Sequence, residues 1–213
     1  MSLFVTFEGI EGCGKTTQIE MAGRFLQRRG TPFIITVEPG GTQVGTELRK
    51  ILLKGTSLHI HERTELFLFA ADRNQHVEEV IRPALNEDKV VLCDRYSDAT
   101  VAYQGYGRGL DPEFVRTIND HSAGVLKPDI TFLFDVPAET GLRRIADRSS
   151  RNGDPPREDR FERERIEFHR RVREGYLLLA GNEPERFRVI DGIRDIETIH
   201  GEICYHLNDV LDG

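Results

Sequence analysis

The chain has 213 residues, of which 38% are hydrophobic and 31% are charged, and its formal net charge is -7 with a pI near 5.6. This length suits a single domain over residues 1–213, and the acidic balance argues against a general nucleic-acid-binding protein, whose electrostatic footprint is usually basic. No apolar run approaches the length that crosses a bilayer and no secretory signal is visible, so we expect a cytoplasmic protein without a membrane partner.

Short apolar runs rich in β-branched residues alternate with longer segments of helical periodicity. The predicted strands cover residues 3–7, 33–37, 90–93, 130–134 and 187–190. The predicted helices cover residues 16–28, 65–85, 113–121, 139–148, 160–180 and 195–211. Strands separated regularly by helices form right-handed βαβ units and a parallel sheet covered on both faces. The sequence therefore predicts a three-layer α/β fold with a five-stranded parallel sheet flanked by helices.

Residues 9–16, GIEGCGKT, follow the first predicted strand, open the first predicted helix and fit the pattern GxxxxGK[ST]. In this pattern backbone N–H groups and the helix N-terminus surround phosphate oxygens. Lys15 would reach the β and γ phosphates of ATP, and the Thr16 hydroxyl would ligate Mg²⁺. The predicted ATP site comprises Gly9, Ile10, Glu11, Gly12, Cys13, Gly14, Lys15, Thr16 and Thr17. The alternative is a glycine-rich turn that binds no nucleotide.

The helix that begins near Glu65 carries an aromatic ring and a forked donor on one face. Phe69 and Arg73 stand four residues apart, so their side chains project together. Such a pair can stack on a base and donate to its carbonyl edge. Spacing alone leaves open that Phe69 belongs to the core and that Arg73 is a surface charge.

Asp94 ends the apolar run VVLCD, which is the position from which P-loop proteins hold the magnesium shell. Arg95 follows directly and could bind the phosphate of a second substrate. The alternatives are a turn-forming aspartate and a surface ion pair.

Residues 149–159 interrupt two helical patterns with a glycine and two prolines, which predicts an exposed loop. The loop contains Arg151 and Arg157, with Arg148 and Arg160 at its edges. We expect a lid over the active site at about residues 148–160, a plain surface loop being the alternative.

Six segments together resemble thymidylate kinases along nearly the whole chain. They are FEGIEGCGKTT at 7–17, EPGGTQVGTELRKILL at 38–53, FLFAADRNQH at 67–76, DRYSDATVAYQGYGRG at 94–109, KPDITFLFDVPAETGLRR at 127–144 and DRFERERIEFHRRVREGY at 159–176. The resemblance implies the P-loop nucleoside monophosphate kinase fold, with ATP and dTMP as substrates, Mg²⁺ as cofactor and a homodimer as the assembly.

The resemblance also implies roles for individual residues at the dTMP site. Phe69 would stack on thymine and Arg73 would donate to its ring carbonyl, while Arg49 and Arg95 would hold the phosphate. The nucleoside pocket would be completed by Glu38, Pro39, Thr100, Tyr103 and Gln104. Glu11 would lie near the sugar 3′-hydroxyl and the phosphate-binding arginine, and Tyr103 would disfavour a 2′-hydroxyl.

Members of this family keep the arginine that stabilises the transferring charge either in the P-loop or in the lid. This P-loop has none, so the chain resembles the bacterial lid-arginine type. The resemblance implies catalytic roles for Lys15, Arg95, Glu11 and Arg148, and it leaves open whether Arg148, Arg151, Arg157 or Arg160 stabilises the transferring group. Thr16 and Asp94 would hold the metal.

Three other classes compete with this interpretation. Another monophosphate kinase would share the P-loop and lid, but the FLFAADR and AYQG segments argue against it. A GTPase would need an Asn-Lys-x-Asp segment, which this chain lacks. A nucleotide sensor without activity would not need the intact set of Lys15, Thr16, Asp94 and Arg95.

Overall fold

The computed structural model describes residues 2–53, 59–152 and 160–212. Its five strands are β1 (Leu3–Glu8), β2 (Phe33–Val37), β3 (Val90–Asp94), β4 (Ile130–Asp135) and β5 (Phe187–Asp191). They form one parallel sheet in the order β2-β3-β1-β4-β5. The predicted five-stranded parallel sheet is confirmed, and four of the predicted strands extend by one residue to end on a carboxylate.

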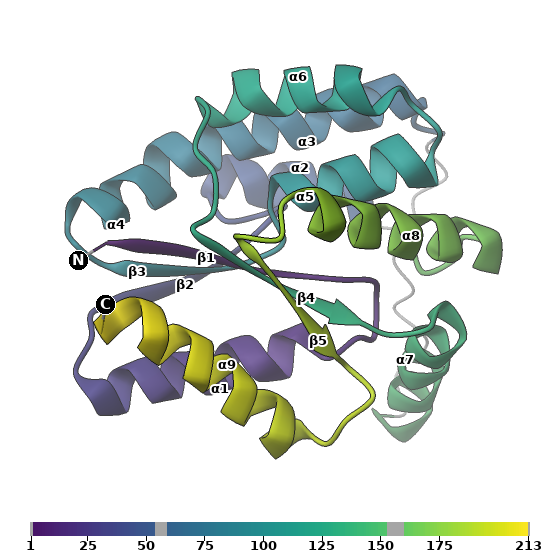
Figure 1. The fold of residues 1–213 in the computed structure, drawn as a ribbon. Coiled ribbons are helices and arrows are strands. Elements are labelled where there is room, and N and C mark those ends of the chain that lie inside the picture. Colours follow the sequence, from purple (N-terminus) through teal and green to yellow (C-terminus); the bar gives the residue numbers. More distant parts are fainter. Residues whose placement is uncertain (1, 54–58, 153–159, 213) are drawn as a thin grey trace.

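Helices cover both faces of the sheet and give the predicted three layers (Figure 1). One layer contains α1 (Lys15–Arg29) and α9 (Ile196–Asp212). The opposite layer contains α2 (Gln43–Leu53), α3 (Glu62–His76), α4 (Arg82–Asn86), α5 (Ser97–Thr100), α6 (Pro112–Ala123) and α8 (Ile166–Asn182). The remaining helix, α7 (Ala138–Asn152), lies beyond the end of β4. In the described residues, no helix combines the length and apolar character that a membrane span requires.

Two predicted helices and the predicted loop differ from the structure. The helix predicted for residues 65–85 is divided into α3, the π-helical turn η1 (Val77–Ile81) and α4. The helix predicted to start at residue 160 starts at Ile166, because Arg160 and Phe161 are held in a turn by contacts to other elements. The loop predicted for residues 149–159 is helical in its first part, since α7 continues to Asn152 and residues 142–152 contain no glycine or proline.

Two helical segments were not predicted from periodicity. One is α2. The other is α5 with the π-helical segment η2 (Val101–Gly107) that continues it. Most residues of η2 are buried, so the segment has no alternation of apolar and polar faces from which a helix could be inferred.

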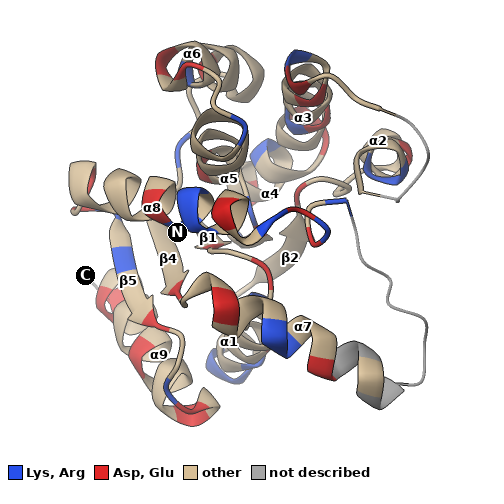
Figure 2. Cartoon of the chain, turned by 90° about the vertical axis from the view of Figure 1, so that its right-hand side faces the viewer, with Lys and Arg blue, Asp and Glu red and all other residues tan. Residues whose placement is uncertain are grey.

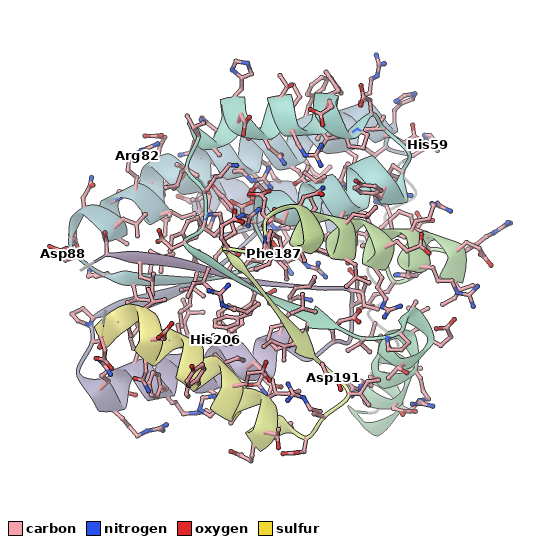
Figure 3. The ribbon with its side chains drawn as sticks, viewed as in Figure 1. His59, Arg82, Asp88, Phe187, Asp191 and His206 are labelled. Carbon is pink, nitrogen blue, oxygen red and sulfur yellow. The ribbon has the colours of Figure 1, made fainter. Side chains whose placement is uncertain are left out.

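The core follows from the apolar strands. All of β1 is buried, and Phe7 packs against Phe132 and Phe134 of the neighbouring strand with ring centroids 5.5 and 6.1 Å apart. At the sheet edge, Phe187 at the start of β5 is buried, whereas Asp191 at its other end is exposed (Figure 3). The carboxyl ends of parallel strands all lie on one side of the sheet, and ligands bind there in folds of this kind. This carboxyl-end side faces the viewer in Figure 2, where acidic and basic residues alternate around β1, β4 and α7.

Candidate active site

The P-loop connects β1 to α1 and bends around the first turn of that helix. Gly12 has a φ of 71°, and a side chain there would collide with the carbonyl of Gly141 in α7. Lys15 is folded back onto the loop, where Nζ donates to the carbonyls of Gly9 at 3.1 Å and Ile10 at 3.0 Å. These bonds hold the ammonium group inside the curve of the loop, where a phosphate chain can replace the carbonyls as its partner.

A cavity of about 220 Å³ opens at the start of α1, and we name it the P-loop cavity. It is lined by Gly12, Cys13, Gly14, Lys15, Thr16, Thr17, Arg144 and Ile145. Arg144 of α7 was not among the predicted site residues. Its NH1 donates to the Gly192 carbonyl at 3.0 Å, which places a guanidinium opposite the N-terminus of α1.

A second cavity of about 220 Å³, the main cavity, lies beside the first at the carboxyl ends of β1, β2 and β3. The two cavities share Gly12, Lys15 and Thr16 in their linings. The structure brings every residue predicted for the acceptor site to the wall of the main cavity, namely Glu38, Pro39, Arg49, Phe69, Arg73, Arg95, Thr100, Tyr103 and Gln104. Two compartments therefore meet at Lys15.

One end of the main cavity is formed by Arg73, whose guanidinium is almost fully buried. Its Nε donates to Glu38 Oε2 at 3.0 Å, and its NH2 donates to Thr100 Oγ1 at 2.7 Å and to the Tyr96 carbonyl at 3.2 Å. Its NH1 donates to Asn119 Oδ1 at 2.7 Å. A guanidinium with four of its five N–H donors bonded is fixed in its plane, so its orientation toward a bound ligand is set in advance.

The aromatic wall beside Arg73 contains Phe69 and Phe161, whose ring centroids lie 6.1 Å apart. Phe69 is half-buried, and Phe161 also contacts Tyr103 in an edge-on arrangement at 5.4 Å. Phe161 was not predicted as a site residue, although it belongs to the segment DRFERE. A planar ligand entering this end of the cavity would meet ring faces and edges.

The other end of the main cavity is formed by Arg95, which has a left-handed backbone with φ of 69°. Its NH1 donates to the Gly9 carbonyl at 2.8 Å and to the Tyr176 hydroxyl at 3.2 Å, and its NH2 donates to Glu11 Oε1 at 3.0 Å. The guanidinium also lies over the ring of Tyr103, 4.9 Å from its centroid. Backbone conformations of this kind cost free energy and cluster at functional sites.

Glu11 links the P-loop to the same arginine. Burial alone would raise the pKa of this carboxyl, but the charge of Arg95, the contact with His169 and the Tyr103 hydroxyl, 2.5 Å away, lower it to about 2. Glu11 is therefore a carboxylate throughout the physiological range, and it holds Arg95 beside the P-loop.

Comparisons with known proteins agree with this geometry. The family model described as thymidylate kinase matches residues 7–203. The thymidylate kinase of Syntrophus aciditrophicus is 50% identical over 211 residues, which cover 99% of this chain and 96% of that protein. The thymidylate kinase of Geobacter sulfurreducens is 52% identical over 199 residues, which cover 93% of this chain and 92% of that protein.

A crystal structure of thymidylate kinase from Ehrlichia chaffeensis matches with a TM-score of 0.75 at 33% identity, covering 97% of this chain and 98% of that one. The chain belongs to the thymidylate kinase family. The predicted family and the predicted P-loop nucleoside monophosphate kinase fold are confirmed, and the chain is a phosphotransferase of that class.

The structure describes the four predicted lid arginines to different extents. Arg148 and Arg151 lie in α7, but the structure describes only their backbone, and Arg157 lies outside the described residues. Arg160 does not line the main cavity. Its Nε donates to the Leu52 carbonyl at 3.2 Å, and its NH2 binds the buried carboxylate of Glu65.

Two residues predicted to hold the metal, Thr16 and Asp94, both line the main cavity. Among the described residues, no cluster of three or more His, Cys, Asp or Glu side chains could hold a metal by itself. Mg²⁺ in kinases keeps several waters and binds one or two protein oxygens together with substrate phosphates. A hydroxyl and a carboxylate beside a phosphate-binding loop fit that requirement.

Glu8, at the end of β1, is a buried carboxyl that sequence reasoning did not assign to the site. Its Oε1 accepts from the Tyr96 N–H and its Oε2 from the Tyr176 hydroxyl, both at 2.7 Å. Burial and the nearby Asp98 carboxylate raise its pKa to about 8, although Arg95 opposes the shift. The Tyr176 hydroxyl thus links Glu8 to Arg95. At neutral pH the Glu8 carboxyl does not carry a full negative charge.

We expect Glu8 to make the stability of the protein pH-dependent. Its pKa of about 8 in the folded state exceeds the ordinary 4.5, so the folded protein binds more protons between these values and the free energy of unfolding falls as pH rises through them. Glu8→Gln keeps an oxygen for the Tyr96 N–H and cannot ionise, so it should remove that fall. Urea unfolding between about pH 5 and about pH 8 measures it; an unchanged pH slope in the variant would contradict the assignment.

Proposed function

We propose that the chain transfers the γ-phosphoryl group of ATP to dTMP, giving ADP and dTDP, as a step in dTTP synthesis. The observation that carries the proposal is the meeting of two cavities at Lys15. One has the phosphate-binding loop of a nucleotide donor. The other has an aromatic wall at one end and two arginines in its lining, Arg49 and Arg95, of which Arg95 donates to the Gly9 carbonyl of the loop. A nucleoside monophosphate in the main cavity would direct its phosphate toward the P-loop.

In this proposal the main cavity separates base recognition from phosphate recognition. Phe69 stacks on thymine and Arg73 donates to a base carbonyl. Arg95 and Arg49 bind the phosphate; NH1 of Arg49 lies 2.5 Å from the Pro39 carbonyl in the cavity wall. The ring of Tyr103 lies under the Arg95 guanidinium and its hydroxyl donates to Glu11. In this proposal Tyr103 lies beside the sugar and disfavours a 2′-hydroxyl.

The chemistry requires positioning and charge neutralisation more than it requires a base. The acceptor phosphate is itself the nucleophile and is largely dianionic near pH 7, so no side chain has to remove a proton. Lys15 neutralises charge on the donor phosphates, while Arg95 holds the acceptor in line with them. Thr16 and Asp94 would hold Mg²⁺, which neutralises donor phosphate charge when bound. An arginine of the lid at about residues 148–160 stabilises the transferring group, and this role stays a prediction for Arg148, Arg151 and Arg157.

We further propose a single-domain cytoplasmic enzyme that assembles as a homodimer. Large apolar side chains are exposed on adjacent helices of one layer, namely Val44 and Ile51 of α2, Phe67 of α3 and Phe114 of α6. Exposed apolar surface of this kind is typical of an interface between subunits. Light scattering measures the mass that decides between monomer and dimer.

The test of the function is acceptor-dependent ADP formation from Mg-ATP. The acceptors dTMP, dUMP, dGMP, AMP and CMP are offered separately, with a control that has no acceptor. A strong preference for dTMP supports the proposal. Equal turnover of another nucleotide would retain the kinase fold and reject the assignment of the base pocket, and turnover independent of acceptor would reject the proposed reaction.

We expect Arg73→Ala to raise the KM for dTMP more than it lowers kcat. Arg73 lies at the end of the cavity that we assign to the base, whereas Lys15 and Arg95 lie at the end where the phosphoryl group moves. Loss of a charged hydrogen bond to the base costs roughly tenfold or more in affinity. Steady-state kinetics with varied dTMP measure this effect, and an unchanged KM would show that Arg73 does not contact the base.

A further inference from the structure

A row of buried hydrogen bonds runs behind the base-recognition end of the main cavity. It starts at Thr36 of β2, whose Oγ1 lies 2.6 Å from Nε2 of His76 in α3. On the other side of the ring, Nδ1 of His76 lies 3.0 Å from Oε1 of Glu38. The second oxygen of Glu38 accepts from Nε of Arg73. His76 therefore lies one residue away from the group that we assign to the base.

The hydrogen bonds of Arg73 leave little freedom for its guanidinium. An arginine has five N–H donors, and the described residues supply acceptors for four of those of Arg73. The remaining donor is on NH1, whose other hydrogen is bonded to Asn119. A base carbonyl can be bonded by this group only if the guanidinium plane stays where its four other partners hold it.

Glu38 is the one ionisable group among the four partners of Arg73, and its carboxylate is also bonded to His76. The Glu38 side chain is 3% exposed, and its two oxygens are divided between His76 and Arg73. A carboxylate oxygen accepts hydrogen bonds, so Nδ1 of His76 donates to Oε1. Without that donor, Oε1 would be buried without a partner, which would favour rotation of the carboxylate away from Arg73.

The position of the imidazole is fixed by the loop that follows β2. A Cβ atom at Gly41 would lie 2.5 Å from both Cδ2 and Nε2 of His76, so the glycine allows the backbone to lie directly against the ring. The same loop is held by Asp72, whose Oδ1 accepts from the Gly40 N–H at 3.1 Å. His76 is fully buried and does not line the main cavity, so it acts only through its neighbours.

We propose that His76 is a positioning residue for base recognition, which orients Arg73 through Glu38 and thereby sets the affinity for the thymine base. The inference rests on the proposed function, because it assumes that Arg73 donates to a carbonyl of dTMP. The histidine contributes through its Nδ1 donor, and the contact with Thr36 only supports the ring.

Three substitutions separate the Nδ1 donor from the volume of the ring. His76→Asn places an amide N–H near the position of Nδ1 and keeps the bond to Glu38. His76→Gln places its amide near Nε2 and loses that bond, and His76→Phe keeps a ring without either donor. Thr36→Val is the matched control, because it removes the Nε2 contact and leaves Nδ1 and Glu38 unchanged.

We expect His76→Gln and His76→Phe to raise the KM for dTMP roughly tenfold, which is the effect of one charged hydrogen bond. His76→Asn and Thr36→Val should stay within about threefold of the wild type. The KM for ATP should not follow the KM for dTMP, and melting temperatures identify variants that do not fold. If His76→Phe does not fold, the KM values of His76→Asn and His76→Gln test the inference by themselves. These two side chains differ by one methylene group, which moves the amide from the position of Nδ1 to that of Nε2.

Several results would overturn the inference. They are a KM for dTMP in His76→Gln equal to that of the wild type, an asparagine variant as weak as the glutamine variant, and a parallel rise of both KM values. The wild type and Arg73→Ala are measured alongside. If the wild type does not use dTMP, the proposed function fails. If the wild type and Arg73→Ala behave as expected and the His76 variants do not, only the positioning role of His76 fails.

Discussion

Lys15→Ala is expected to lower kcat by at least about 10²- to 10³-fold, the loss seen when one group that stabilises a transition-state charge is removed. The ammonium group lies where the two cavities meet, and it is bonded to the carbonyls of Gly9 and Ile10 inside the P-loop. Alanine removes the positive charge at the donor phosphates and has no group that could replace it. Steady-state ADP formation with saturating dTMP measures the loss.

A matched lysine tests whether the effect is local. Lys89 directly precedes β3, so it lies at the amino ends of the strands, away from the active site, and it forms an ion pair with Glu87. Lys89→Ala removes the same charge and should leave kcat within about twofold, because a surface ion pair contributes little. A Lys15→Ala enzyme that keeps more than about a tenth of wild-type kcat would show that the P-loop lysine does not stabilise the transferring charge.

The P-loop and the sheet could be predicted from the sequence because both have local signatures. Each strand is a short apolar run, and GIEGCGKT carries its spacing within eight positions of the chain. The surroundings of Arg73 have no such signature. Its partners Glu38, Thr100 and Asn119 come from three separate segments, and only folding brings them to one guanidinium.

Glu8 and Phe161 show why the remaining site residues were not predicted. Glu8 ends a strand and has the same sequence context as an exposed carboxylate, and its raised pKa arises from burial beside Asp98, which lies 90 residues further along the chain. Phe161 lies in a segment that was predicted to be helical, but the turn that presents its ring is held by the bond from the Arg160 N–H to the Leu53 carbonyl. Both features depend on contacts between distant segments.

Arg95→Ala is expected to abolish most turnover and also to destabilise the fold, and the two effects have different causes. The guanidinium joins Gly9, Glu11 and Tyr176, so its loss removes a phosphate-binding charge and leaves a buried carboxylate unpaired. Breaking a buried ion pair from one side costs about 3–5 kcal/mol. Because Arg95 lowers the pKa of Glu11 in the folded state, the pair stabilises the wild type above pH 4.5, and this stabilisation is lost as pH falls toward about 2.

The double variant Glu11→Gln/Arg95→Ala separates the two causes. A neutral amide removes the unpaired charge, so the double variant should regain about half or more of the stability lost in Arg95→Ala when unfolding is measured at neutral pH. It should not regain turnover, because the charge of Arg95 beside the acceptor phosphate is still missing and Arg49 alone remains to hold that phosphate. If glutamine restored activity together with stability, Arg95 would act by keeping the P-loop folded, and the acceptor phosphate would have to be held by other groups such as Arg49.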